Sequence, residues 1–507
     1  MNASIPRLLI TALSSGSGKT VVTCGLLKAL QNKGYKPASF KCGPDYIDPL
    51  FHQEALGIEG GNLDGFFQNQ QEMQESFARR FQECGADIAV LEGVMGYFDG
   101  MGDSARASSF ETASWLDCPA VLVVDARGAF LSVAAVVQGF LHFQPGDQSL
   151  IQSGNESSVQ IGNQLPIQPE DQLPVQPGNG IRAVILNRVS PSVYPRLKTL
   201  IESRLRIPVA GYLPRLDWLH FESRHLGLLL PEEVEDVKGQ LEKLASAAEE
   251  TLDLSLLLRI AGECGTNAQQ SSTQQPEKGE GKERERHSKV KIAVARDAAF
   301  SFYYRDNLRL LEELGGCLTE FSPISDQALP EGTCGLLLGG GYPEVFAGEL
   351  GENLPMRQAI RRAAEEGMPI LAECGGFLYL QESLSDGEGT VYPMAGVLPG
   401  KGFGPVGLRR FGYVNLSADQ DGLYLKQGET LRAHEFHYWD SDCCGEIMEA
   451  RKPDGRRSWA CMQEKKRVLA GFPHLYYPSC PAFARRFVEK CREYQKEALQ
   501  RKEDTAS

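Results

Sequence analysis

Short apolar runs alternate with longer amphipathic stretches through the first half of the chain. The runs span residues 7–12, 38–41, 88–91, 120–125 and 183–186. Runs of this length suit buried strands, and the stretches between them are long enough for helices. The alternation therefore predicts an α/β domain built on a parallel sheet.

The same rhythm starts again at Val290 after a polar interval. Strands are predicted over 291–295, 335–338 and 369–373, and helices over 305–314 and 354–366. We therefore expect two α/β domains, spanning residues 1–261 and 290–490, followed by a charged tail over 491–507.

Two polar stretches interrupt this pattern. Residues 144–180 are rich in Gln, Pro, Gly, Asn and Ser and contain near-repeats, which predicts a low-complexity insertion at the surface. Residues 262–289 end in mixed charge, and we expect them to link the two domains.

Composition supports two domains and indicates the class of partner and the cellular compartment. At 507 residues, with 42% hydrophobic and 23% charged residues, the chain is typical of globular proteins but too long for one core. The formal charge of −14 argues against nucleic acid as the main partner. None of the thirteen cysteines forms a C-x-x-C pair, which favours reduced thiols in the cytoplasm.

Neither a signal peptide nor a membrane span is expected. The apolar stretch 8–13 is too short and wrongly flanked for a signal peptide. Residues 118–141 contain Asp125 and Arg127 and are better interpreted as a strand, a turn and a helix.

A glycine-rich loop follows the first predicted strand. Its candidate nucleotide ligands are Ser15, Gly16, Ser17, Gly18, Lys19 and Thr20. Backbone N–H groups there can bind the phosphates of ATP, Lys19 can reach the β and γ oxygens, and Thr20 can bind Mg²⁺. Leu13 stands where the strict pattern has glycine, and Ser14 where dimerising ATPases of a related class carry lysine. A plain glycine-rich turn is the alternative, which the strand–loop–helix context disfavours.

Charged residues follow the next strands at the same expected sheet edge. The segment KCGPDYID contains Lys41, Asp45 and Asp48, and the segment EGVMGYFDG contains Glu92 and Asp99. The carboxyl ends of parallel strands meet at one edge, so these side chains should lie near the phosphate loop. Carboxylates there can bind Mg²⁺, for which Asp45 and Glu92 are the candidates, or take part in catalysis. For Asp45 and Asp48 of the KCGPDYID segment, carboxylates in a Gly-Pro-Asp turn are the alternative.

Two further polar residues end strands of the first domain. Asn187 suits recognition of a purine by its side-chain amide. Asp125 suits either a metal contact or the N-cap of a helix.

The second domain has a cysteine between a strand and a helix. At such an elbow the thiol of Cys374 is exposed, and the helix N-terminus favours its thiolate. N–H groups at Gly340, Gly341 and Gly375 could bind an oxyanion. His474 follows a strand over 468–472 and could activate Cys374 as a base. A buried structural cysteine and a structural histidine are the alternatives.

These features resemble a class I glutamine amidotransferase domain. The class has glutamate two residues after the histidine, where this chain has Tyr476, so the third member of the triad is absent or comes from elsewhere. Together with the segments 14–20, 41–48, 92–100 and 432–438 (RAHEFHY), nearly the whole chain resembles the cobyrinate a,c-diamide synthases. The first domain is also similar to dethiobiotin synthetase.

The resemblance implies an ATP- and glutamine-dependent ligase of cobalamin biosynthesis with Mg²⁺ as cofactor. ATP would activate the a- and c-carboxylates of cobyrinate, a corrin, as acyl phosphates, and ammonia from glutamine would displace phosphate. It also implies a tunnel for ammonia, and a homodimer is the assembly we consider. His434, Glu435 and His437 of the RAHEFHY segment could contact glutamine, contact substrate or only pack.

Other functions stay open on the residues alone. A nickel-sirohydrochlorin a,c-diamide synthase shares this architecture and chemistry on a different tetrapyrrole. Cobyrate synthase fits less well, because KCGPDYID fits the diamide family better. From a different class, the chain could be a regulatory P-loop ATPase with an inactive amidotransferase-like domain, although intact Lys19, Cys374 and His474 argue against that.

Overall fold

The computed structural model describes residues 5–145, 179–219, 223–224, 227–228, 236–264 and 289–506. The predicted insertion over 144–180 and the predicted linker over 262–289 therefore lie almost entirely outside the described residues. The chain divides into two compact units, Met1–Gln274 (unit 1) and Gln275–Ser507 (unit 2).

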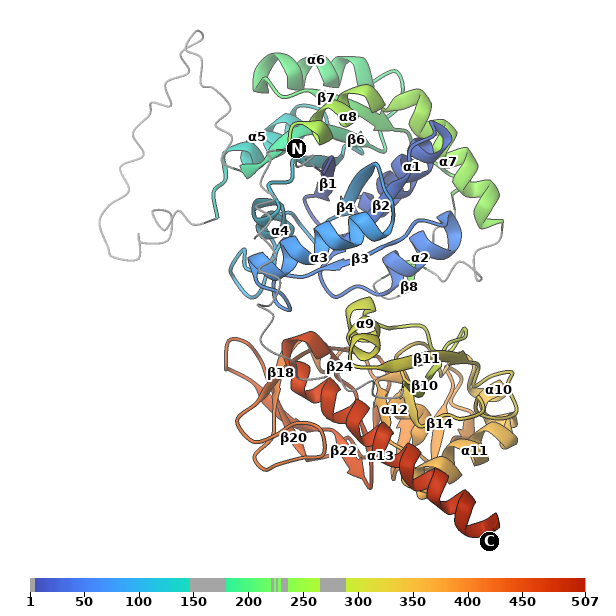
Figure 1. Ribbon diagram of the computed structural model, residues 1–507. Helices are drawn as coiled ribbons and strands as arrows, with labels where there is room; N and C mark the ends of the chain where they lie inside the picture. The colour runs from blue at the N-terminus through green and yellow to red at the C-terminus, as the bar shows by residue number, and fades with distance from the viewer. Residues whose placement is uncertain are drawn as a thin grey trace. The chain divides into compact units, whose positions relative to one another are not determined.

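Unit 1 is built on a seven-stranded parallel sheet, as the sequence predicts (Figure 1). The strand order is β3-β2-β4-β1-β5-β6-β7. The central strands are buried on both faces because helices cover both, which explains their continuous apolar runs. The strands are β1 (Arg7–Ala12), β2 (Pro37–Cys42), β3 (Gly60–Leu63), β4 (Ile88–Glu92), β5 (Ala120–Asp125), β6 (Ile181–Asn187) and β7 (Val209–Leu213).

The helices of unit 1 form two layers. Apolar residues of α1, α2, α7 and α8 pack into the core on one face of the sheet, and those of α3, α4, α5 and α6 into the core on the other. The helices are α1 (Lys19–Asn32), α2 (Ile47–Leu56), α3 (Gln70–Glu83), α4 (Ser109–Trp115), α5 (Leu131–His142), α6 (Tyr194–Leu205), α7 (Val237–Thr251) and α8 (Leu254–Gly262). A short hairpin, β8 (Ser223–Arg224) with β9 (Gly227–Leu228), is also described.

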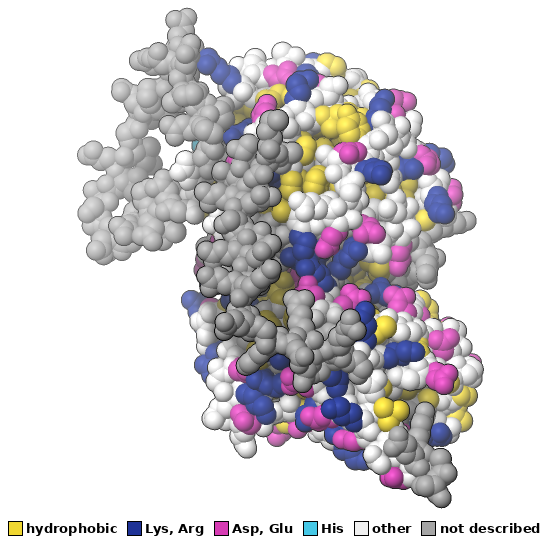
Figure 2. Space-filling model, viewed as in Figure 1, with side chains coloured by type: hydrophobic (Ala, Val, Ile, Leu, Met, Phe, Trp, Pro, Cys, Tyr) yellow, Lys and Arg dark blue, Asp and Glu magenta, His cyan; other side chains and the backbone are white. Residues whose placement is uncertain are grey.

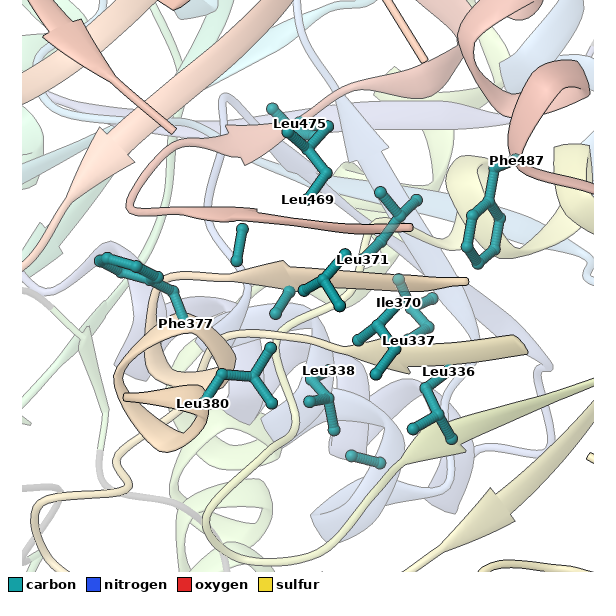
Figure 3. Close-up of a cluster of buried hydrophobic side chains, with 14 of the residues drawn as sticks. Leu336, Leu337, Leu338, Ile370, Leu371, Phe377, Leu380, Leu469, Leu475 and Phe487 are labelled. Carbon is teal, nitrogen blue, oxygen red and sulfur yellow. The ribbon is translucent and has the colours of Figure 1, made fainter. Parts of the chain in front are cut away.

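Unit 2 has its own central sheet, in the order β11-β10-β12-β13-β23-β22. Its strands are parallel except β22, which runs antiparallel to β23. Figure 3 shows leucines of β12 and β13 packed near Phe377 and Leu380 of α12 in the core of this unit. The elements are β10 (Val290–Ala295), α9 (Arg305–Glu313), β11 (Gly316–Phe321), β12 (Gly335–Leu338), α10 (Ala347–Glu352), α11 (Leu354–Glu365), β13 (Ile370–Glu373), α12 (Gly375–Leu380), β22 (Gln463–Lys465) and β23 (Val468–Gly471).

A strand-rich region between α12 and β22 was not predicted from the sequence. It contributes a four-stranded sheet, β15-β14-β16-β19, and most of a five-stranded sheet, β21-β20-β17-β18-β24. The last strand, β24, comes after β23 and pairs antiparallel with β18. The strands are β14 (Ser383–Ser385), β15 (Val391–Pro393), β16 (Lys401–Phe403), β17 (Phe411–Ser417), β18 (Thr430–Phe436), β19 (Asp440–Ser441), β20 (Met448–Arg451), β21 (Ser458–Cys461) and β24 (His474–Leu475).

The chain ends in one long helix, α13 (Pro481–Ala506), after the short turn η4 (Tyr477–Ser479). Cys491 and Tyr494 of α13 are buried in the core of unit 2, so the helix packs beyond the predicted start of the tail at residue 491. On the face drawn in Figure 2, basic and acidic side chains are interspersed over both units. Among the described residues, no helix combines the length and the apolar character needed to cross a membrane.

Candidate active sites

The phosphate loop of unit 1 connects β1 to α1. Gly16 and Gly18 have φ values of 77° and 95°, in the left-handed region that favours glycine. A Cβ atom on Gly18 would lie 2.0 Å from Nδ2 of Asn187, so only glycine fits there. Because α1 begins at Lys19, the loop presents the first N–H groups of the helix, which is a backbone geometry that binds phosphate.

Lys19 and Thr20 lie in the first turn of α1. Nζ of Lys19 donates to two backbone oxygens, at 3.0 and 2.5 Å. Burial and the neighbouring Lys41 lower the pKa of Lys19 to about 8, which leaves it mainly protonated at pH 7. Oγ1 of Thr20 donates to Oε1 of Glu92 at 2.6 Å. The predicted acid at the end of β4 therefore reaches the phosphate loop.

Lys41, Asp48 and Glu92 form a buried charge cluster at the ends of β2 and β4 and the start of α2. Nζ of Lys41 donates to the carboxylate of Asp48 and, at 2.9 Å, to Oε1 of Glu92. It also lies 3.7 Å from Oδ2 of Asp45. The three side chains of the cluster are at most 6% exposed. One cation thus holds together three of the predicted carboxyl groups.

The pKa values of this cluster follow from burial and from Lys41. Burial raises the pKa of Glu92 to about 7 and that of Asp45 to about 6. Burial also acts on Asp48, but Lys41 outweighs it and lowers the pKa of that carboxyl. Although burial opposes it, Asp48 and Glu92 raise the pKa of Lys41, so the lysine stays charged.

Asp45 and Asp99 also hold the backbone of their loops. Oδ1 of Asp45 accepts the N–H groups of Ile47 at 2.9 Å and Asp48 at 3.2 Å, at the start of α2. Oδ2 of Asp99 accepts the N–H of Gly96 at 2.9 Å and closes the turn after β4. The turn alternative therefore describes Oδ1 of Asp45, whose Oδ2 faces Lys41, and Asp99 has a similar role in its own turn.

Asn187, at the end of β6, lies beside the phosphate loop. Its Nδ2 donates to the backbone O of Ser17 at 2.9 Å, and its Oδ1 accepts the N–H of Arg188 at 3.0 Å. Arg188 in turn donates to the backbone O of Gly16 at 3.0 Å and to Oδ2 of Asp125 at 2.7 Å. The amide of Asn187 therefore supports the backbone of the loop, an orientation that differs from the predicted contact with a purine.

Cys374 of unit 2 lies at the elbow between β13 and α12, with φ of 48° and ψ of −103°. A positive φ at a residue with a side chain costs about 1–3 kcal/mol and is typical of functional sites. The N–H of Cys374 donates to the backbone O of Gly471 at 2.8 Å, and its Sγ lies 3.9 Å from the backbone O of Phe436. These two contacts hold the cysteine between the end of β23 and the end of β18.

The prediction of an exposed thiolate at Cys374 is wrong. The residue is 7% exposed, and burial, followed by the charges of Glu344 and Glu435, raises the pKa of the thiol. Desolvation disfavours the charged form, and the N-terminus of α12, a helix of six residues, does not outweigh it. The resting cysteine is a neutral thiol.

The glycine run after β12 contacts His474 and the residue that follows Cys374. A Cβ atom on Gly340 would lie 2.4 Å from Cε1 of His474, and one on Gly375 would lie 3.1 Å from the backbone N of Gly341. The N–H of Gly339 donates to the hydroxyl of Tyr303 at 2.8 Å. The run therefore touches the histidine on one side and the turn after Cys374 on the other.

His474 lies on β24, opposite His434 of β18. Its side chain is buried, and burial, followed by the charge of His437, lowers its pKa to about 3. A neutral imidazole is the form that a general base requires. Tyr476, where the class has glutamate, instead donates to Oδ2 of Asp306 at 3.1 Å.

The RAHEFHY segment forms β18 and the turn after it, directly beside His474. Glu435 is fully buried, and its Oε1 lies 3.0 Å from Nε2 of His437 and 3.3 Å from Nε of Arg410. Its Oε2 accepts from Nε1 of Trp459 at 3.0 Å. The contacts of Glu435 and His437 are thus with neighbouring protein groups, close to His474. They agree with the packing role, and the two ligand-binding roles stay open.

A polar cavity of about 440 Å³ opens on the same five-stranded sheet. Asn415 of β17 pairs with Arg432 of β18 on one side and with Arg451 of β20 on the other, so two arginines flank one asparagine. The lining residues are Asn415, Ser417, Thr430, Arg432, Arg451 and Ser479. Two guanidinium groups among neutral polar side chains suit an anionic group.

Comparison with known proteins identifies both units. Residues 8–227 match the CobQ/CobB/MinD/ParA nucleotide binding domain, and residues 291–479 match the CobB/CobQ-like glutamine amidotransferase domain. A cobyrinate a,c-diamide synthase of Caldanaerobacter subterraneus subsp. tengcongensis is 36% identical over 490 residues, which cover 96% of this chain and 98% of that protein. The enzyme of that name from Salmonella typhimurium is 35% identical over 501 residues, which cover 97% and 99%. The chain belongs to the cobyrinate a,c-diamide synthase family.

Membership of the cobyrinate a,c-diamide synthase family confirms the resemblance found in the sequence. A nucleotide-binding domain precedes a glutamine amidotransferase domain, as predicted, and the family is one of glutamine amidotransferase-type ligases. The nucleotide-binding domain also supports ATP as the co-substrate.

Two of the residues predicted to bind Mg²⁺ fit such an ion. Within the described ranges, no three or more His, Cys, Asp or Glu residues are grouped to hold a metal ion. Mg²⁺ commonly takes only one or two protein oxygens and completes its shell with water and phosphate. Thr20 and Glu92 provide such oxygens beside the phosphate loop, and Oε2 of Glu92 is buried without a hydrogen bond. Oδ1 of Asp45, the third candidate, accepts two backbone N–H groups, and its role in binding Mg²⁺ stays a prediction.

Sequence reasoning missed several residues that complete these sites. His52 of α2 is buried behind the charge cluster, where its Nδ1 lies 2.8 Å from Oγ of Ser39 and its Nε2 lies 3.8 Å from Oε2 of Glu92. Arg188 and Arg410 contact the phosphate loop and Glu435, respectively. Neither motif spacing nor periodicity marks these three residues, because each reaches its site across the fold.

Proposed function

We propose that this protein amidates the a- and c-carboxylates of cobyrinate with ATP and glutamine. The observation that carries the proposal is similarity over nearly the full length to enzymes named cobyrinate a,c-diamide synthase. A phosphate loop with Lys19 in unit 1, and in unit 2 an elbow cysteine and a buried histidine that contacts the glycine run, support the same chemistry.

Unit 1 would activate the carboxylate. The loop N–H groups and Lys19 bind the phosphates of ATP, and the carboxylate oxygen attacks the γ-phosphorus in line. The bond to the β–γ bridging oxygen breaks, which gives an acyl phosphate and ADP. Thr20 and Glu92 would hold Mg²⁺, which neutralises charge on the phosphates when bound.

The charged cluster behind the loop would hold the acidic residues of this site. Lys41 balances the buried Asp48 and Glu92, so their positions would be fixed before substrate arrives. With a pKa of about 7, Glu92 can hold or release a proton near neutral pH. Asp45 and Asp99 would shape the loops that meet the substrate, through their hydrogen bonds to the backbone.

Unit 2 would release ammonia from glutamine. The Sγ of Cys374 attacks the side-chain amide carbon, and His474 takes the thiol proton and passes it to the departing nitrogen. Backbone N–H groups among Gly340, Gly341 and Gly375 would stabilise the oxyanion. Water then hydrolyses the thioester to glutamate, and the ammonia displaces phosphate from the acyl phosphate to give the amide. A protected route for ammonia stays a prediction.

The test measures ADP release with Mg-ATP, cobyrinate and either glutamine or ammonium. We expect Cys374→Ala to lose turnover with glutamine and keep turnover with ammonium, and Lys19→Ala to lose both. Cys317→Ala, at an exposed cysteine on β11, is the matched control and should behave as wild type. Wild-type protein that is inactive on cobyrinate but active on nickel-sirohydrochlorin would move the assignment to that substrate.

If turnover with glutamine does not require Cys374, the regulatory alternative is favoured, in which unit 2 is an inactive amidotransferase-like domain. In that case ATP hydrolysis by wild type and Cys374→Ala would be equal under glutamine. A homodimer, a cytoplasmic location and the lack of a nucleic-acid partner stay predictions.

A further inference from the structure

One polar atom of His52 and one of Glu92 are buried without a hydrogen bond and lie near each other. Among the described residues, neither Nε2 of His52, on α2, nor Oε2 of Glu92, at the end of β4, has a hydrogen-bond partner. The two atoms are 3.8 Å apart, and the residues are 1% and 0% exposed. Most buried polar atoms in proteins are hydrogen-bonded, and leaving one unpaired is destabilising. Two such atoms side by side therefore require an explanation.

The other ring nitrogen of His52 indicates where the ring proton lies. Nδ1 is 2.8 Å from Oγ of Ser39, a buried residue of β2, and among the described residues it is the acceptor that this hydroxyl reaches. Burial lowers the pKa of His52 to about 4, so the ring is neutral at pH 7 and has a single N–H. When the hydroxyl donates to Nδ1, this N–H is on Nε2. The ring then has a donor facing the Glu92 carboxylate.

The carboxylate of Glu92 is held at one oxygen only. Its Oε1 accepts from Oγ1 of Thr20 at 2.6 Å and from Nζ of Lys41 at 2.9 Å. Two bonds to one oxygen leave the carboxylate free to pivot about that oxygen, whereas a bond to Oε2 would fix its plane. The plane matters because Oε1 is the oxygen that reaches the phosphate loop.

We propose that His52 is a positioning residue for the nucleotide site, whose Nε2–H binds Oε2 of Glu92 and so holds Oε1 at Thr20, where these two residues would meet Mg²⁺. The inference rests on the Mg²⁺ role proposed above for Glu92. A shift of about 0.8 Å brings the two atoms to hydrogen-bond distance. Hydrogen bonds at catalytic sites are often long before substrate binds and tighten in the complex.

The charges around His52 agree with a neutral donor at this position. Asp48 raises the pKa of His52 and Lys41 lowers it, so the two charges oppose each other at the ring. Lys41 already pairs with Asp48 and Glu92, so the cluster has its cation without His52. What His52 adds is therefore a directed hydrogen bond and not a charge.

Two amide substitutions separate the two nitrogens of His52. Nδ1 is two bonds from Cβ, as is the amide nitrogen of asparagine, and Nε2 is three bonds from Cβ, as is that of glutamine. His52→Asn therefore keeps a polar group for Ser39 and removes the donor to Glu92, whereas His52→Gln keeps that donor. Both variants place a neutral amide in the same buried position, so a general loss of packing affects them alike.

The assay measures binding of an ATP analogue whose β and γ phosphorus atoms are joined by a methylene group. Its affinity for the full-length protein is determined by calorimetry in EDTA and in saturating MgCl₂. Loss of an outer contact to a metal ligand lowers metal affinity about 10- to 100-fold. We therefore expect affinity in MgCl₂ to fall at least about tenfold in His52→Asn and to stay within about threefold of wild type in His52→Gln.

Affinity in EDTA should be unchanged in both variants, because His52 acts through the metal ligand. In a Glu92→Ala background, His52→Asn should cause no further loss beyond about twofold. His142→Asn changes an exposed histidine of α5 in the same way and is the matched control, which should behave as wild type. If His52→Asn does not fold, His52→Gln still decides, because a tenfold loss there would contradict the inference.

The contrary outcomes are distinct. Wild-type affinity in His52→Asn would overturn the inference and would be expected if Oε2 of Glu92 bound the metal ion itself. Equal loss in both variants, or a loss also seen in EDTA, would mean that the ring only packs. Wild-type protein without any gain in affinity from MgCl₂ would contradict the Mg²⁺ role of Glu92, and the inference with it. Neither glutamine nor cobyrinate is used, so the substrate assignment is tested separately.

Discussion

The contact between the glycine run and His474 can be tested by adding one methyl group. In Gly340→Ala the new Cβ would lie 2.4 Å from Cε1 of His474, whereas ordinary contacts lie at 3.4–4 Å. The imidazole or the loop must therefore move by about 1 Å. A misplacement of that size can lower a rate about 100-fold.

We therefore expect Gly340→Ala to reduce glutamine-dependent turnover about 100-fold and to leave ammonium-dependent turnover within about twofold of wild type. The assay is ADP release with each nitrogen source, together with glutamate release in the absence of ATP. Gly348→Ala is the matched control, because a Cβ at this position of α10 would lie 3.7 Å from the nearest atom. It should leave both activities unchanged.

Two outcomes would refute this reasoning. Full glutamine-dependent activity in Gly340→Ala would mean that His474 does not need its position against the glycine run. Equal loss of both activities, with a lowered unfolding midpoint, would mean that the substitution disrupts the fold and not the glutaminase site alone.

Three further perturbations address the other buried groups. Lys41→Met leaves Asp48 and Glu92 buried without a cation, so the free energy of unfolding in urea at pH 7 should fall by about 3–5 kcal/mol. A fall below about 1 kcal/mol would contradict the view that Lys41 stabilises the two carboxylates. Burial raises the pKa of Glu373 from 4.5 to about 8. Between these two values the folded protein keeps a proton that the unfolded chain loses, so the free energy of unfolding should fall as the pH rises from 4.5 to about 8. Glu373→Gln should flatten that dependence in urea titrations at pH 5 to 8. Asn187→Ala removes one donor to the phosphate loop, so KM for ATP should rise roughly five- to tenfold with glutaminase activity unchanged.

The sequence predicted the parallel strands well because burial on both faces gives each one an unbroken apolar run. Residues 7–12 and 120–125 are strands in the structure with the predicted limits. The antiparallel strands after α12 carry no such signal. β15 (Val391–Pro393) and β16 (Lys401–Phe403) have three residues each and are largely exposed, so neither has an apolar run. β16 also pairs with β19, which lies much farther along the chain.

At the sites, the sequence predicted which residues gather but not what each one contacts. Lys41 and Glu92 could be placed together because parallel strands end at one edge. The amide of Asn187 points to the loop backbone, and Cys374 is buried rather than exposed. Both orientations depend on tertiary packing, which local motifs do not encode.

The charge cluster of unit 1 and the Cys374 and His474 site of unit 2 differ in how their buried ionisable groups are held. In unit 1, Lys41 keeps two carboxyl groups paired with a charge. In unit 2, burial raises the pKa of Cys374 and lowers that of His474, so both rest in their neutral forms. A neutral thiol is a poor target for oxidants and a weak nucleophile. In the proposed mechanism, attack on glutamine would then be coupled to transfer of the thiol proton, and we expect stabilisation of the oxyanion by the glycine run to be the larger contribution to the rate.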